Sequence, residues 1–104
     1  MGFIGCGIRL RDTSIFLVLL DKDPPEEERN DLVRAIMDEP YPGAERLAPL
    51  SFNITGTNWR QATVAYPRSL NDLAQLHALR LLAERLMELG YLNSMPVLPS
   101  PVRC

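Results

Sequence analysis

The sequence predicts an α+β fold, a ββαββα two-layer sandwich in which a four-stranded, mainly antiparallel sheet carries two helices on one face. Three short segments alternate apolar and polar residues, a fourth is apolar throughout, and two longer segments repeat apolar residues at helical spacing. Their order is strand, strand, helix, strand, strand, helix. The chain of 104 residues has room for one compact domain. We therefore expect a single domain over residues 1–92 and a proline-rich, extended tail over residues 93–104.

The first two strands are predicted over residues 3–10 and 15–20, separated by turn-forming residues, so that they pair as a hairpin. The even positions of the first strand are apolar and should form one buried face: Ile4, Cys6, Ile8 and Leu10. On this face Cys6 would be a buried thiol. The second strand is apolar at every position, so both of its faces should be covered.

The first helix follows the second strand. We expect Asp23 to be its N-cap and Pro24 its first residue, and Pro40 ends it. Three acidic residues in the first turn complement the helix dipole: Glu26, Glu27 and Glu28. An apolar stripe at helical spacing faces the core: Leu32, Val33, Ile36 and Met37.

The second half of the chain repeats this order of elements. Residues 50–55 form a half-buried strand, residues 55–58 a turn, and residues 59–66 the fourth strand. The last helix runs from Leu70 to about Leu89, with Ser69 as its cap, and Gly90 closes it. Most of its leucines form one broad band, and two fall outside that band: Leu73 and Leu81.

Charge and cysteine content limit the partners and the compartment. Eleven basic and thirteen acidic residues give a net charge of −2, which argues against a protein that neutralises nucleic-acid phosphates. The longest apolar run, Ile15–Leu20, is too short to span a membrane. The two cysteines, Cys6 and Cys104, form no CxxC pair and match a reducing cytoplasm. We expect a cytoplasmic protein with no membrane contact.

No catalytic constellation is evident, and we expect no cofactor and no metal. Asp21 and Asp23 follow an apolar strand, but no second cluster supplies further ligands, and a helix start accounts for Asp23. The glycines of residues 2–7 lie inside a strand rather than before a helix, so they do not form a nucleotide-binding loop. His77 is the only histidine and lies on the polar side of the last helix.

The strongest prediction concerns the surface. If both helices cover one face of the sheet, the other face should be polar, yet the second strand places three large aliphatic residues there: Ile15, Leu17 and Leu19. We predict that these three, and next Leu73 and Leu81, contact another protein or a second copy in a homodimer. The tail segment 95–98 is the competing cover for the same strand.

The leading functional hypothesis is a small non-enzymatic interaction protein: a regulatory subunit, an adaptor or an inhibitor of a larger complex. Glu26, Glu27 and Glu28 would contact a basic partner surface. A second hypothesis is a small-molecule or enzymatic site enclosed by a homodimer, with Arg9, Arg11 or His77 as polar groups. A third is weak nucleic-acid or other anion binding through three arginines: Arg9, Arg11 and Arg60.

Overall fold

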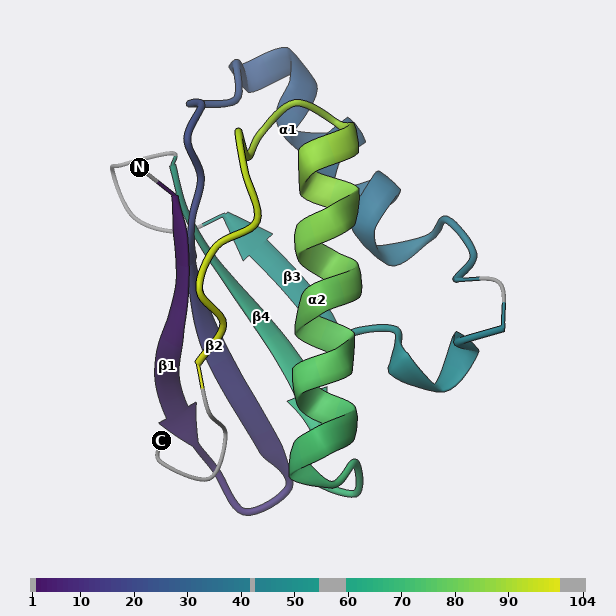
Figure 1. The fold of residues 1–104 in the computed structure, drawn as a ribbon. Helices are drawn as coiled ribbons and strands as arrows, with labels where there is room; N and C mark the ends of the chain where they lie inside the picture. The colour runs from purple at the N-terminus through teal and green to yellow at the C-terminus, as the bar shows by residue number, and fades with distance from the viewer. Residues whose placement is uncertain (1, 42, 55–59, 100–104) are drawn as a thin grey trace.

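The computed structural model describes residues 2–41, 43–54 and 60–99 and contains the predicted order of strands and helices (Figure 1). The four strands are β1 (Phe3–Arg9), β2 (Thr13–Leu19), β3 (Ser51–Ile54) and β4 (Gln61–Pro67). The helices are α1 (Glu26–Met37), the single 3-10 turn η1 (Glu45–Leu47) and α2 (Asp72–Glu88). The predicted α+β two-layer fold is therefore confirmed.

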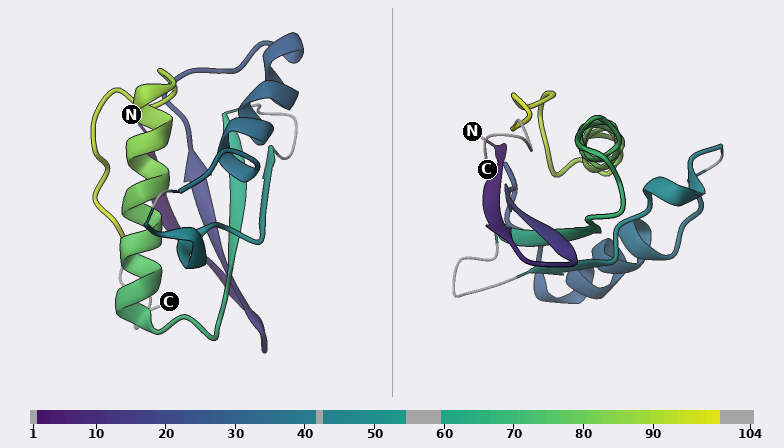
Figure 2. Two further views of the ribbon diagram at one scale, coloured as in Figure 1. Left: turned by 90° about the vertical axis from the view of Figure 1, so that its right-hand side faces the viewer. Right: turned by 90° about the horizontal axis from the view of Figure 1, so that it is seen from below.

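The sheet is antiparallel throughout, with strand order β1-β2-β4-β3. This order places the two hairpins side by side, so β2 and β4 are the central strands and β1 and β3 the edges. Helix α2 lies across one face, and α1 lies beside β3 at the margin opposite β1 (Figures 1 and 2). We call the face under α2 the inner face and the opposite face the outer face.

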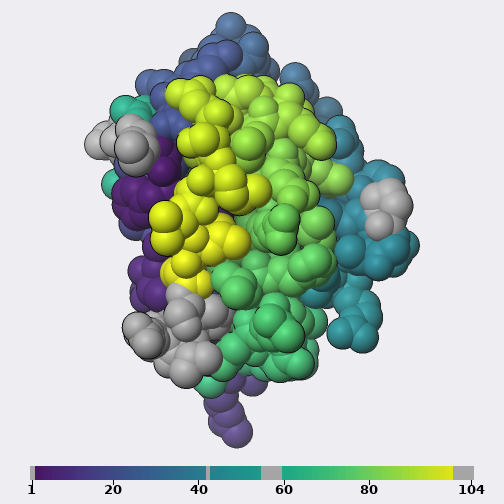
Figure 3. Space-filling view, in the orientation of Figure 1, coloured from purple at the N-terminus to yellow at the C-terminus, as the bar shows by residue number. Residues whose placement is uncertain are grey.

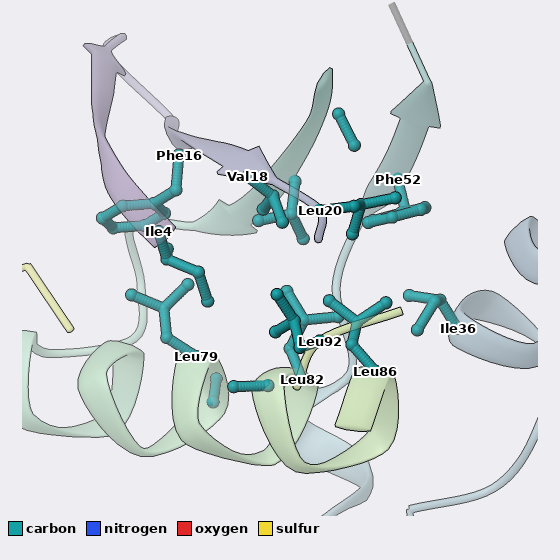
Figure 4. Packing of buried hydrophobic residues seen from close by; sticks show 14 of the residues in the cluster. Ile4, Phe16, Val18, Leu20, Ile36, Phe52, Leu79, Leu82, Leu86 and Leu92 are labelled. Atoms are coloured by element: carbon teal, nitrogen blue, oxygen red, sulfur yellow. The ribbon is translucent and has the colours of Figure 1, made fainter. Parts of the chain in front are cut away.

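The core fills the space between the inner face and the two helices (Figure 4). The even residues of β2 point into it, and Phe16 packs edge-on against Tyr66 with 6.3 Å between ring centroids. Helix α2 contributes Leu79, Leu82 and Leu86, and α1 contributes Leu32 and Ile36 to the same cluster. Burial of these side chains supplies the main favourable term in folding.

A β-bulge at Gly7 corrects the prediction for β1. Cys6 pairs with Phe16 and Ile8 pairs with Ile15, so Gly7 is an extra residue and the alternation changes after it. Ile8 consequently lies on the outer face with 59% of its surface exposed instead of in the core, and Cys6 and Leu10 are exposed as well. A Cβ at Gly7 would lie 2.6 Å from the carbonyl oxygen of Ile15, which accounts for glycine there.

Both helices begin later than the sequence predicted. The N-cap of α1 is Pro25 rather than Asp23, because a residue before a proline disfavours the helical conformation and Pro24 therefore cannot begin the helix. The N-cap of α2 is Asn71 rather than Ser69, and its side chain accepts a hydrogen bond of 2.8 Å from the backbone N–H of Ala74.

Arg85 of α2 joins the two helices. Its guanidinium donates hydrogen bonds to the carbonyl oxygens of Ala35 (3.1 Å), Glu39 (3.2 Å) and Pro40 (2.8 Å), at the end of α1. The guanidinium carbon also lies 4.0 Å from the ring centre of Tyr41, in a cation–π contact. The Tyr41 hydroxyl donates a hydrogen bond to the carbonyl oxygen of Ile36. A cation at a helix C-terminus satisfies unpaired carbonyls and complements the dipole, so Arg85 fixes α1 on α2.

The described part of the tail, residues 93–99, returns along the inner side of the molecule, between β1 and α2 (Figures 1, 2 and 3). The Asp21 carboxylate accepts a 2.9 Å hydrogen bond from the Asn93 backbone N–H at its start, and Leu98 packs against the core. Val97 is 91% exposed. The tail therefore completes the inner layer.

Candidate interaction surface

Three rows of outer-face side chains include residues of both β1 and β2, as the strand registers define them, and the pair Thr13 and Pro67 lies beyond the first row. The first row is Ile8, Ile15, Ala65 and Ser51. The middle row is Gly5, Leu17, Thr63 and Asn53. The third row is Phe3, Leu19 and Gln61. The β1–β2 half is thus apolar, and the β4–β3 half carries mainly small, uncharged polar groups.

The apolar half is open to solvent to different extents. Ile8 (59%) and Phe3 (44%) are exposed, whereas Ile15, Leu17 and Leu19 are half-buried. A Cβ at Gly5 would lie 3.3 Å from the Phe3 ring, so this ring lies beside Gly5. The result is one continuous apolar area on β1 and β2, of the kind that marks interfaces.

Among the described residues, no helix and no part of the tail crosses this apolar area. Helix α2 and residues 93–99 lie on the inner side of the sheet, and α1 lies beyond β3 (Figure 2). The hypothesis that residues 95–98 cover β2 on its outer face is therefore wrong for the described tail. The positions of Ile15, Leu17 and Leu19 agree with the prediction, and their role in binding stays a prediction.

Leu73 and Leu81 lie elsewhere. Both belong to α2, on the other layer of the sandwich, so they cannot join the apolar area on the outer face in one surface. Leu73 is 76% exposed, while Leu81 is half-buried and lines a shallow cleft of about 160 Å³ beside Tyr41 and Arg85. The five predicted contact residues thus divide into two separate sets.

The three arginines predicted to bind anions do not come together. Arg9 pairs with Asp72 at 3.4 Å, and Arg11 lies in the turn between β1 and β2. Arg60 lies at the opposite end of the sheet, where its side chain donates a 2.9 Å hydrogen bond to the carbonyl oxygen of Leu20. A single phosphate-binding cluster of these three residues is therefore not formed.

The acidic residues of α1 have separate tasks. Glu26 and Glu27 are exposed at the helix N-terminus. Glu28 accepts a 2.9 Å hydrogen bond from the hydroxyl of Tyr91, a residue just after α2. Burial, and then this hydrogen bond and the Glu28 charge, raise the pKa of Tyr91 to about 12. Glu28 thus has a structural contact, and a contact of the triplet with a basic partner stays a prediction.

The described residues offer little material for catalysis. They contain no group of three or more His, Cys, Asp or Glu side chains able to hold a metal ion. His77 is exposed on α2, and the Asp21 carboxylate is occupied by backbone N–H groups, first that of Asn93, which lower its pKa. Cys6, predicted to be a buried thiol, is instead exposed and disulfide-bonded. Cys104 lies outside the described residues.

Comparison of the chain with protein-family models, with characterised proteins and with solved structures gives no match. In the part of the chain that the structure describes, none of the helices has the length and apolar character needed to cross a membrane.

Proposed function

We propose that this chain is a small, non-enzymatic protein-interaction module that binds through the apolar half of its outer sheet face. One observation carries the proposal: Phe3, Ile8, Ile15, Leu17 and Leu19 are contiguous, and no described element covers them. Exposed aliphatic and aromatic side chains gain about 25 cal/mol per Å² when a partner removes them from water. A regulatory subunit, an adaptor and an inhibitor are all roles that fit such a module.

Leu17→Glu tests the proposal, because it places a charge in the centre of the apolar area. We expect native mass spectrometry of host-derived protein to show wild type with a bound partner chain and Leu17→Glu without one. Leu73→Glu is the matched control, since it makes the same chemical change at an exposed leucine on the other layer.

Circular dichroism must show that Leu17→Glu is folded. If that variant unfolds, Ile8→Glu replaces it, since Ile8 is 59% exposed and its substitution places no charge in the core. Partner binding that survives both substitutions would overturn the proposal.

The cytoplasmic location also stays a prediction, and the redox state of Cys6 in the host cell would test it, because cytosolic thiols are kept reduced.

A further inference from the structure

We infer that the occupant of the outer face is a second copy of this chain, packed face to face about a two-fold axis. The inference rests on the proposed function and names its partner. None of the described segments of the same chain lies on the apolar half, because the described tail and both helices lie elsewhere. The described part of the chain therefore leaves this half open to another chain.

None of the described strand residues that point to the outer face is charged; charged side chains such as Arg11 and Arg60 lie beyond the strand ends. A charged peptide or nucleic acid would find no complementary group here and would lose solvation. The surface that fits best is itself uncharged and partly apolar, and this same face of a second copy has those properties.

A two-fold axis along the middle row, in the plane between two sheets, turns one face onto the other and leaves β1 above β1 and β2 above β2. Phe3 and Leu19 then oppose Ile8 and Ile15 of the second copy, and Leu17 opposes itself. Apolar halves meet apolar halves and polar halves meet polar halves, in the aligned packing that two sheets commonly adopt.

The outer face is small. Its strands lie about 4.8 Å apart, and three of them have seven residues whereas β3 has four, so the face covers about 400 Å² in projection. Two such faces give about 800 Å², below the range of stable, specific interfaces. A dimer of this size should dissociate reversibly, so it must be sought over a range of protein concentrations.

Sedimentation equilibrium of the full chain over roughly three decades of concentration, from about 1 μM, tests the inference. We expect a monomer–dimer equilibrium in both oxidising and reducing buffer, which excludes a disulfide-linked dimer. Ile8→Glu should weaken it about a hundredfold, because each substitution enters the interface twice and buries an unpaired charge. Leu73→Glu should leave it unchanged.

A charge-pair experiment tests the axis itself. Phe3→Lys should weaken the dimer as Ile8→Glu does, since the two positions oppose each other. A mixture of the two variants should associate more tightly than either variant alone, because one dimer site then pairs Lys with Glu while the other keeps the native Phe–Ile contact. A mixture that associates no better than the separate variants would overturn the proposed axis.

The remaining outcomes separate the two proposals. A folded chain that stays monomeric would overturn the proposal that a second copy is the partner. If a benzophenone amino acid at position 8 then cross-links to a different protein in host cells, the proposed function stands. If the chain stays monomeric and no cross-link forms, both are wrong. A dimer that resists Ile8→Glu and is weakened by Leu73→Glu would move the interface to α2 and overturn both.

Discussion

Phe16 and Leu17 are neighbours in β2, but their side chains enter different environments. Phe16 points to the inner face, where it is 2% exposed among residues of both layers. Leu17 points to the outer face, where only Gly5 on one side and Thr63 on the other adjoin it within its row. A strand that is apolar on both faces usually has cover on both faces. The described part of this chain covers the inner face of β2, and we propose that a second copy covers the outer face.

Substituting Phe16 or Leu17 by alanine should give the largest difference in stability between the inner and outer faces of β2. Phe16→Ala removes a fully buried ring and leaves a cavity, so we expect the free energy of unfolding to fall by about 3–5 kcal/mol. Leu17→Ala in the monomer should cost about 1 kcal/mol, because Leu17 is half-buried. Urea unfolding at low protein concentration measures both values. Equal losses would mean that β2 is internal on both faces.

The next comparison is between two arginines of α2: Arg85, which joins α2 to the end of α1, and Arg80, which does not. Arg85→Met keeps the aliphatic stem and removes the hydrogen bonds to the end of α1, so we expect a loss of about 2 kcal/mol. Arg80→Met is the control: Arg80 is exposed and only pairs with Glu84 at 3.4 Å, which is worth a few tenths of a kcal/mol. If the two variants unfold at the same urea concentration, Arg85 is not the anchor of α1.

The smallest expected effect is the pH dependence of the inner layer. A tyrosine whose pKa is higher in the folded state favours folding below its unfolded value of 10 and loses that contribution as the pH rises through the folded value. For Tyr91 this window is pH 10 to about 12, and burial also raises the pKa values of Tyr41 and Tyr66. Stability should therefore decrease steadily above pH 10.

Tyr91→Phe should make that decrease less steep, whereas Leu17→Ala should leave its slope unchanged, because Leu17 does not titrate. Chemical unfolding at several pH values between 9 and 12 measures the slope. A slope that is the same in wild type and Tyr91→Phe would contradict the assigned contact between Tyr91 and Glu28.

Periodicity was sufficient to predict the fold class, the element order and the placement of Ile15, Leu17 and Leu19 opposite the core. It could not predict the bulge at Gly7, because one extra residue in a strand depends on the close approach of β2. Ile8 was therefore assigned to the core although it lies on the outer face. The most exposed side chain of the candidate surface was missed for the same reason.

Contacts distant in sequence were also beyond prediction. Arg85 reaches carbonyl groups more than forty residues away, and nothing in its local sequence distinguishes it from Arg80. The side of the sheet on which the tail lies depends on Leu98 packing into the core and on Asn93 binding Asp21. Apolar residues in a tail indicate that it covers something, but their spacing does not indicate which face.

Native mass spectrometry of the full chain at increasing concentration tests the central claim, that the outer face is an interface between two copies, most directly. We predict a species at twice 11.7 kDa that grows with concentration and disappears in Ile8→Glu. A bare 11.7 kDa species at every concentration, from folded protein, would contradict the claim and leave the apolar face without a second copy to cover it.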